Sequence, residues 1–283
     1  MNETIFKNKT AVVTGAGGTL CSVVAIELAR LGARVALLGR TVGKLEPVAA
    51  AIRAGGGTAL PLSVDVTDAA AVETVRQRIA QELGPCALLV NGAGGNRNDA
   101  VTTTTEFQAE EISDARPENM RGFFNLDPNI MLEVIKLNTI GTLIPCQVFG
   151  REMAQQGRGA IVNFASMNSY RPLTKNLAYS LSKAGVVNLT QWLAVYLAPA
   201  GIRVNAVAPG FFANERSREI LMTEDGGLTA RGQNVMAHTP MKRFGEAQDL
   251  LGTVCWLLDD ERAAFVTGIT VAVDGGFSAS SGV

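Results

Sequence analysis

Short runs of β-branched and apolar residues alternate along the chain with longer segments in which apolar residues recur at helical spacing. This alternation is typical of repeated strand–helix–strand units, which place the strands in a mostly parallel sheet with helices on both faces. The sequence therefore predicts a single-domain α/β fold, a doubly wound sheet of the Rossmann type with about seven strands. The predicted strands are residues 10–13, 34–38, 58–64, 87–90, 160–164, 203–207 and 269–273.

Two segments interrupt the alternation. Residues 96–128 are polar and contain four consecutive threonines, and residues 211–245 mix Arg, Glu, Gly and Met after a Pro-Gly pair. Both follow predicted strands, at the sheet edge where open α/β folds bind ligands, so we expect them to build the substrate pocket. No proline- or serine-rich linker divides the chain, and residues 1–283 are interpreted as one domain.

The composition excludes several classes of function. A net charge of −1 and a pI near 6.0 offer no basic surface for nucleic acid or an anionic membrane. The four cysteines are widely spaced and the single histidine is His238, which favours buried thiols in a reducing cytoplasm over a disulfide framework or a metal site. No apolar run approaches the ~20 residues that span a bilayer, and the N-terminus does not have the pattern of a signal peptide. We expect a cytoplasmic protein that acts on a small molecule.

A glycine-rich loop, "TGAGGTLC" at residues 14–21, joins the first predicted strand to a predicted helix. Gly15 can make the tight turn, and Gly17 and Gly18 let backbone amides approach a pyrophosphate at the helix N-terminus. The loop alone is weak evidence, because structural glycine turns between a strand and a helix are common.

The stretch "AYSLSK" places Tyr179 and Lys183 on one face of a helix that is predicted to reach Leu197. A lysine ammonium favours the phenolate, so we expect Lys183 to lower the pKa of Tyr179 from ~10 and make it a proton donor. Ser166 follows the strand "AIVNFAS" and can hydrogen-bond a carbonyl oxygen in the same pocket. A tyrosine and a lysine at this spacing are usually only a surface pair of a helix, but Ser166 and the glycine loop weaken that alternative.

With these motifs in this order, the chain resembles the short-chain dehydrogenase/reductase family over nearly its whole length. The resemblance implies an enzyme that transfers a hydride between a nicotinamide cofactor and a ketone or secondary alcohol. A non-catalytic dinucleotide-binding module is the alternative, although a decayed enzyme has no reason to keep all four of the catalytic residues that the resemblance implies. The motifs are Thr14-Gly15, Asp65-Val66, "NGAG" at 91–94, Asn138, Ser166, Tyr179 with Lys183, and Pro209-Gly210.

The resemblance implies a catalytic tetrad of Asn138, Ser166, Tyr179 and Lys183. Tyr179 would exchange a proton with the substrate oxygen, and Ser166 would polarise the carbonyl. Lys183 would bind the nicotinamide ribose, and Asn138 would hold a water that relays protons from Lys183. The implied cofactor residues are Gly15, Gly18, Thr19, Leu20, Arg40, Asp65, Val66, Asn91, Ala93, Gly94, Tyr179, Lys183, Pro209, Gly210 and Phe212.

The glycine loop departs from the family pattern, because Thr19 and Cys21 stand where the family usually has glycine. A thiol is small, and the Thr19 hydroxyl can bind a phosphate at the helix N-terminus. We therefore interpret the loop as specialised rather than lost.

The end of the second predicted strand bears on the choice of cofactor. It has no acidic residue to accept hydrogen bonds from a ribose 2′-hydroxyl, and Arg40 follows directly. Arg40 can bind a 2′-phosphate bidentately, with Lys44 as a weaker attractor. This favours NADP(H). NAD(H) is the alternative, since an arginine here can stack on adenine with either cofactor and Gly18 lacks the basic side chain common in NADP-preferring relatives.

The segments "NGAGGN", "RPLT", "LTARG", "HTPMKRFG" and "VDGGFSASSGV" are similar to those of the D-mannonate oxidoreductase (fructuronate reductase) and gluconate 5-dehydrogenase-like branch. The resemblance implies a six-carbon keto-sugar acid as substrate and a homotetramer as assembly. A steroid, acyl or xenobiotic ketone is the alternative substrate, because the pocket is built from the segments that vary most within this fold.

An acidic substrate needs a cation, and arginine matches a carboxylate bidentately. Arg171 is the predicted partner, since it lies five residues from Ser166 on a connection stiffened by Pro172. Asn96 is the predicted partner of a substrate hydroxyl. A solvated loop charge or an ion pair between subunits is the alternative role of Arg171. The other candidate cations are Arg97, Arg116, Arg216, Arg218 and Arg231.

Overall fold

The computed structural model describes residues 4–213 and 221–280. Its described strands form one parallel sheet in the order β3-β2-β1-β4-β5-β6-β7. Each predicted strand is present, and its ends differ from the prediction by no more than two residues. The strands are β1 (Thr10–Thr14), β2 (Arg34–Gly39), β3 (Thr58–Ser63), β4 (Cys86–Asn91), β5 (Gly159–Phe164), β6 (Ile202–Pro209) and β7 (Thr270–Val273).

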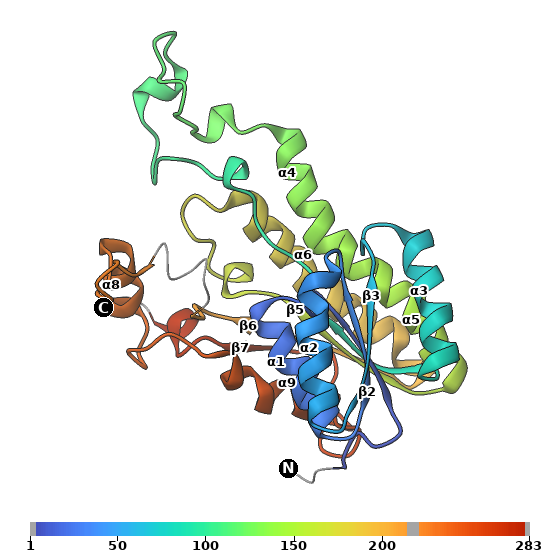
Figure 1. The fold of residues 1–283 in the computed structure, drawn as a ribbon. Helices are drawn as coiled ribbons and strands as arrows, with labels where there is room; N and C mark the ends of the chain where they lie inside the picture. The colour runs from blue at the N-terminus through green and yellow to red at the C-terminus, as the bar shows by residue number, and fades with distance from the viewer. Residues whose placement is uncertain (1–3, 214–220, 281–283) are drawn as a thin grey trace.

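Helices cover both faces of the sheet (Figure 1). One face carries α1, α2 and α9, and the other carries α3, α5 and α6. The predicted doubly wound α/β fold is therefore confirmed. The helices are α1 (Thr19–Arg30), α2 (Val42–Ala54), α3 (Ala69–Glu82), α4 (Pro128–Ile135), α5 (Gly141–Gln156), α6 (Leu177–Leu197), α8 (Ala230–His238) and α9 (Leu251–Leu258).

The two helical layers explain why the inner strands carry consecutive apolar residues rather than an alternation of apolar and polar ones. All residues of β1 are buried, and neighbouring side chains enter opposite cores, Val12 beneath α3 and α5 and Val13 beneath α1. Successive side chains of a strand point to opposite faces, so a strand covered on both sides needs apolar residues in succession. The sheet is thereby fixed from both sides.

The strand order places a crevice at the carboxyl edge of the sheet, where open α/β folds bind ligands. The chain leaves β1 toward β2 on one side, whereas β4 joins β1 on the other, so the loops after β1 and β4 diverge at the carboxyl edge. Thr14 connects the two loops, because its hydroxyl accepts hydrogen bonds from the amides of Gly92 and Ala93, both at 3.1 Å.

Residues 101–126, here called the arm, project from the body between β4 and α4 (Figure 1). The arm contains only short turns of helix, η2 (Ala109–Ile112) and η3 (Phe123–Asn125). Lys175, in the loop before α6, attaches it to the body. Its carbonyl accepts from the Thr102 amide at 3.2 Å and its Nζ donates to the Thr103 carbonyl at 2.8 Å. The arm forms most of the first irregular segment expected from the sequence.

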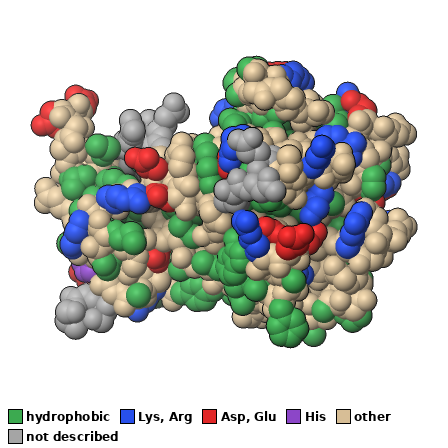
Figure 2. Space-filling model, turned by 90° about the horizontal axis from the view of Figure 1, so that it is seen from below, with side chains coloured by type: hydrophobic (Ala, Val, Ile, Leu, Met, Phe, Trp, Pro, Cys, Tyr) green, Lys and Arg blue, Asp and Glu red, His purple; other side chains and the backbone are tan. Residues whose placement is uncertain are grey.

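The second irregular segment, 211–245, contains α8 and returns to the end of β6, where Phe212 forms a bridge with Gly245. Within residues 4–213 and 221–280, no helix is long and apolar enough to cross a membrane, and no three His, Cys, Asp or Glu side chains are grouped to hold a metal ion. On the face shown in Figure 2, basic and acidic side chains are interspersed rather than gathered by sign.

Candidate active site

The predicted serine, tyrosine and lysine come together at the carboxyl end of β5. Ser166 follows β5 directly, and Tyr179 and Lys183 lie one turn apart near the start of α6. The Ser166 and Tyr179 side chains are hydrogen-bonded, and Lys183 Nζ lies 5.8 Å from the centre of the Tyr179 ring. The three side chains thus lie together in one site.

Burial controls the protonation of this group. It raises the pKa of the Tyr179 phenol above its ordinary value, against a smaller lowering by the Ser166 hydrogen bond. It also lowers the pKa of the Lys183 amine to about 8. Lys183 Nζ donates to the Phe164 carbonyl at 2.6 Å. The pKa of Tyr179 is therefore raised in this structure and not lowered as predicted, because desolvation of the phenol dominates.

The fourth tetrad residue, Asn138, organises the loop after β4. It lies in the π-helical turn η4 (Lys136–Ile140), which joins α4 to α5; such turns are frequent at functional sites. Asn138 Nδ2 donates to the Gly95 carbonyl at 2.7 Å, and Oδ1 accepts from the Gly95 amide at 3.1 Å. A Cβ on Gly94 would lie 2.5 Å from Asn138 Oδ1 and 3.4 Å from Lys183 Nζ. Glycine is therefore required beside the tetrad.

The glycine loop has the geometry of an anion site. Gly15 has φ +66°, and a Cβ there would lie 2.8 Å from the Ala93 amide. The helix α1 begins at Thr19 with Gly18 as N-cap, without a side-chain cap or an acidic residue in its first turn. The first turn begins at the exposed Thr19, and its backbone amides and the positive end of the helix dipole can face a phosphate.

Cys21 is accommodated by a glycine elsewhere in the chain. Its buried Sγ occupies the space next to Gly92, where a Cβ would lie only 2.0 Å from the sulfur. Burial raises the pKa of the Cys21 thiol to about 12, so the group stays protonated and serves as packing. Cysteine fits at position 21 because position 92 is glycine and leaves room for the sulfur. This agrees with the interpretation of the loop as specialised.

The adenosine end of the crevice is more open. A cavity of about 130 Å³ is lined by Arg40, Asp65 and Val66, and a second cavity of about 560 Å³ continues from Arg40 and Asp65 to Asn96. Arg40 and Asp65 are exposed. The Thr67 amide, which donates to Asp65 Oδ1 at 2.8 Å, holds the pKa of Asp65 below its usual value, and the Thr67 hydroxyl, Arg40 and Lys136 contribute further lowering.

The remaining predicted cofactor residues are placed as follows. Asn91 is buried, and its Nδ2 donates to Asn163 Oδ1 at 2.9 Å, so its side chain connects strands. Gly210 packs on Asp274, and Pro209 and Phe212 are buried at the end of β6. Leu20 is partly buried and packs on the core beneath α1.

The structure separates the arginines proposed to bind the substrate carboxylate. Arg97 forms ion pairs with Asp99 and Glu133, and Arg116 donates to the Met120 carbonyl at 2.6 Å. Arg171 and Arg231 are exposed and have no ion pair among the described residues. Arg216 and Arg218 lie outside the described residues.

Asn96, predicted to bind a substrate hydroxyl, lies in the larger cavity, and its Nδ2 donates to Asn176 Oδ1 at 3.0 Å. It therefore connects the loop after β4 to the start of α6. The sequence did not indicate Lys136 or Asn176, and although Gly92 lies in the predicted "NGAG" turn, its contact with Cys21 was not foreseen. Lys136 could have been found from its place two residues before Asn138, whereas the contacts of Gly92 and Asn176 are visible only in three dimensions.

These features fit a nicotinamide dinucleotide: a close-approach turn at Gly15, an anion site at the start of α1, an adenosine cavity, and a serine–tyrosine–lysine group next to Gly94. Residues 9–225 also match the family model described as short chain dehydrogenase. The chain belongs to the short-chain dehydrogenase/reductase family. It is an oxidoreductase that uses a nicotinamide cofactor.

Named relatives support the assignment over the full length. The chain is 46% identical to the uncharacterized oxidoreductase UxuB of Bacillus subtilis, with 97% of this chain and 96% of the relative covered. It is similar to the NAD-bound structure of a Haemophilus influenzae protein named "putative D-mannonate oxidoreductase" (42% identity, TM-score 0.91, 98% and 97% covered). A gluconate 5-dehydrogenase of Burkholderia cenocepacia, in complex with NADP and tartrate, is 25% identical (TM-score 0.83, 98% of each chain).

Proposed function

We propose that this dehydrogenase interconverts a keto-sugar acid of the D-fructuronate type and its hydroxy acid, and that NADP(H) is its preferred cofactor. The names of the Haemophilus and Burkholderia relatives support a sugar-acid substrate. The observation that carries the proposal is Arg171, an exposed cation without an ion pair among the described residues, five positions after Ser166.

In the direction of reduction, the bound cofactor supplies the hydride, and the chain supplies the proton and the orientation. Ser166 holds the carbonyl oxygen through its hydroxyl, and the Tyr179 phenol gives that oxygen its proton. Burial keeps the phenol protonated until it is needed, because its pKa is raised. The proton therefore leaves Tyr179 only when charge develops on the substrate oxygen.

Lys183 stabilises the charge that this step leaves on Tyr179. Its pKa of about 8 means that the amine carries a proton through neutral pH and loses it in mild alkali. The Phe164 carbonyl fixes the position of Nζ, and Asn138 with Gly94 fixes the wall beside it. The group is thus preorganised by buried contacts, which lowers the cost of orienting it during the reaction.

The substrate carboxylate is the feature that distinguishes a sugar acid from a neutral sugar. A carboxylate that leaves water needs a charged partner, and Arg171 provides a planar pair of donors on the loop that carries Ser166. Arg97 and Arg116 are less suited, because their guanidinium groups are already bound within the chain.

The function is tested by assaying keto-sugar acids, their neutral sugar analogues and simple acyl ketones with NADPH and NADH. We expect the best kcat/KM with a keto-sugar acid. Arg171→Ala should raise KM for the acid about 10- to 100-fold, as for loss of a hydrogen-bonded charge, and leave KM for the cofactor unchanged.

The matched control is Arg158→Ala, an exposed arginine immediately before β5, at the opposite edge of the sheet. It should change neither constant. If the ratio of acid to neutral substrate is the same in Arg171→Ala and in the unmodified enzyme, Arg171 does not bind the carboxylate. Preferred turnover of acyl ketones would replace the sugar-acid assignment.

The preference for NADP(H) rests on Arg40. It follows β2 at the adenosine cavity, has no ion pair among the described residues, and no acidic residue precedes it on the strand. A 2′-phosphate would place two negative charges beside this guanidinium, a pairing that a bare ribose cannot offer. The bound NAD and NADP of the two named relatives show that each cofactor occurs among related proteins.

The proposed assembly is a homotetramer that uses the outer face of α5 and α6. Trp192 and Tyr196 are stacked there with ring centres 4.7 Å apart, yet 58% and 66% of their areas are exposed. They border a cavity of about 1070 Å³ that is lined by α5, α6 and the start of α3. A second copy related by a twofold axis would cover this face with the same residues. Trp192→Ala should lower the mass measured by sedimentation, and an unchanged mass would exclude this face.

A further inference from the structure

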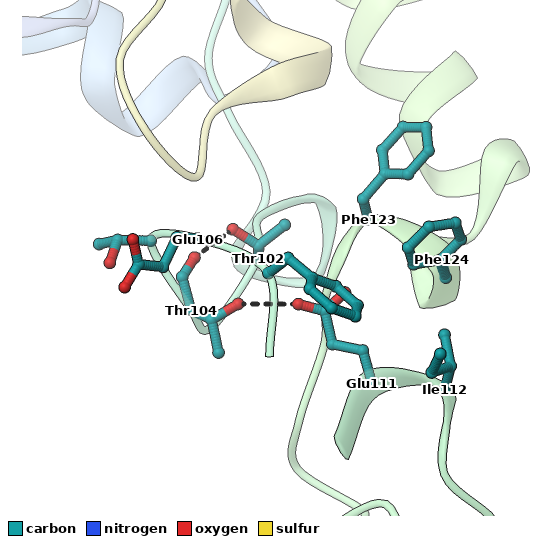
Figure 3. A pocket seen from close by; sticks show the side chains of 9 residues that line it. Thr102, Thr104, Glu106, Glu111, Ile112, Phe123 and Phe124 are labelled. Carbon is teal, nitrogen blue, oxygen red and sulfur yellow. Dashed lines mark hydrogen bonds between the residues drawn. The ribbon is translucent and has the colours of Figure 1, made fainter. Parts of the chain in front are cut away.

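The arm carries a cluster of exposed apolar side chains around a cavity of about 470 Å³ (Figure 3). Phe107, Ile112, Phe123 and Phe124 are 58%, 67%, 67% and 63% exposed. Phe124 meets both other rings edge to face, with ring centres 6.1 Å from Phe107 and 5.4 Å from Phe123. A preorganised aromatic cluster on a projecting segment is a surface suited to binding.

A buried carboxylate also lines this cavity. Glu111 is only 3% exposed, and its Oε1 accepts from the Gln108 amide at 3.2 Å and from the Thr104 hydroxyl at 3.4 Å (Figure 3). Its Oε2 is buried and has no hydrogen-bond partner among the described residues. A buried carboxylate without a cation is costly, so a positive group from outside the arm would stabilise it.

The arm does not contain a suitable cation. Its two arginines are used within the segment and its base: Arg116 donates to the Met120 carbonyl, and Arg121 donates to the carbonyls of Val101 and Asn98. With five carboxylates and these two arginines, residues 101–126 carry a net charge of −3. Since the whole chain carries −1, the remainder carries +2. The arm and the body are thus complementary in charge.

We propose that the cavity of the arm receives a basic side chain from the body of a second copy of this chain, so that the arms join copies to one another. A guanidinium or ammonium can lie against the aromatic rings and pair with Glu111. The arm projects away from its own body and is held in that position by Lys175, so the body of another copy is the complementary surface within its reach.

This contact differs from the face of α5 and α6 proposed above, and it does not depend on the substrate. It joins the arm of one copy to the body of another. The two copies therefore contribute different surfaces to the contact, which makes it heterologous. Arg231, an exposed arginine away from the face of α5 and α6 and without an ion pair among the described residues, is a candidate for the entering side chain.

The first test locates the contact. Isotopically heavy and light full-length chains are mixed and treated with a zero-length reagent that joins carboxylates to lysines. We expect heavy–light products that connect Glu106 or Glu110 of the arm to a lysine outside the arm. The proposal would be overturned if every cross-link from the arm joined two chains or segments of the same isotopic label. It would also be overturned if no cross-link from the arm reached another copy.

The second test compares the contributions of the aromatic cluster and of Glu111 to the association of copies, which is measured by sedimentation equilibrium. Phe124→Ala should weaken association at least about 10-fold, whereas Val42→Ala, an exposed apolar residue on α2, should not. Glu111→Gln should weaken association by a similar factor and reduce its dependence on salt, because a charge pair is lost. Its control is Glu110→Gln, which removes an adjacent exposed charge and should have little effect.

Three of these four positions lie in the segment expected to build the substrate pocket, so the circular dichroism spectrum and the unfolding midpoint, rather than kcat, report whether each variant is folded. Glutamine at 111 retains an acceptor for the Gln108 amide, which preserves the local turn. If Glu111→Gln and Phe124→Ala both associate as the unmodified protein does, the arm does not join copies. If capture of a different protein displaces the heavy–light products, the partner is not a second copy.

Discussion

The two ends of the cofactor crevice are built in different ways. At the catalytic end, Asn138 and Lys183 are buried and are held by backbone carbonyl groups. At the adenosine end, Arg40 and Asp65 are exposed, and Arg40 has no ion pair among the described residues. The catalytic end is therefore a packed network that tolerates little change, whereas the proposed preference for NADP(H) rests on a single charge in solvent.

This difference predicts how substitutions act. A buried group that is bound on several sides transmits any displacement to its neighbours, because packed interiors have few voids. An exposed charge interacts through water and salt, so its loss alters one interaction and leaves the remainder in place. The following experiments compare the two ends, in order of decreasing effect.

The largest effect is expected at the phenol. Tyr179→Phe removes the proton donor but retains the ring, so kcat should fall about 1,000-fold while the dissociation constants of the cofactors change little. Single-turnover kinetics and titration of cofactor fluorescence measure the two quantities. Retention of most of kcat would show that another group supplies the proton.

The next effect comes from two adjacent glycines. Gly94→Ala places a Cβ 2.5 Å from Asn138 Oδ1, whereas a Cβ on Gly95 meets no atom within 4 Å. Displacing the tetrad in this way should lower kcat about 100-fold in Gly94→Ala. Gly95→Ala serves as the matched control with nearly normal kcat. Equal activity of both variants would mean that the catalytic end is not closely packed.

At the adenosine end, Arg40→Ala should weaken NADPH binding about 10- to 100-fold and leave NADH binding nearly unchanged. The discrimination should also decline with added salt in the unmodified protein, since the interaction lies in solvent. Calorimetric titration with both cofactors measures this discrimination. Comparing the affinity for adenosine 2′,5′-bisphosphate with that for adenosine 5′-phosphate isolates the contribution of the 2′-phosphate. An unaltered preference for NADPH over NADH would assign the selectivity to other residues.

The smallest effect is the pH dependence of folding stability from Lys183. Its pKa is about 8 in the folded protein, against the ordinary lysine value of 10.5 in the unfolded chain, so between these values the unfolded chain binds more protons. This contribution therefore makes the free energy of unfolding rise as pH increases from about 8 to about 10.5, and leaves it level below that range. Lys183→Met should remove this part of the rise in denaturant titrations. A steeper rise in the variant would contradict the assigned shift.

The same lysine links stability to rate. Reduction should slow as pH increases beyond about 8, because the neutral amine no longer stabilises the Tyr179 phenolate as it forms. The pH profile of kcat/KM for ketone reduction measures this limb. Its midpoint should stay near the pKa of Lys183 whichever ketone substrate is used.

Much of the molecule could be predicted from residue patterns. The strands β1 and β5 were recognisable because both faces are buried and their central positions are consecutive apolar residues. Tyr179 and Lys183 share a helix, so their spacing alone placed them on one face. The resemblance to a family added Asn138 and Ser166, which lie in separate elements and have no local signal that connects them.

Tertiary structure decided what depends on contacts between distant segments. The fit of Cys21 requires Gly92 across the crevice, and the pKa of Tyr179 is raised because the fold desolvates the phenol. The polar segment that is expected to build the substrate pocket projects as an arm over residues 101–126, and no pattern could reveal that its Glu111 is buried. The sequence by itself determined the periodicity, the turns and the chemistry on each helix, since these depend on neighbouring residues. Burial, charge environment and close approach depend on the whole fold, because they are set by atoms that are far apart along the chain.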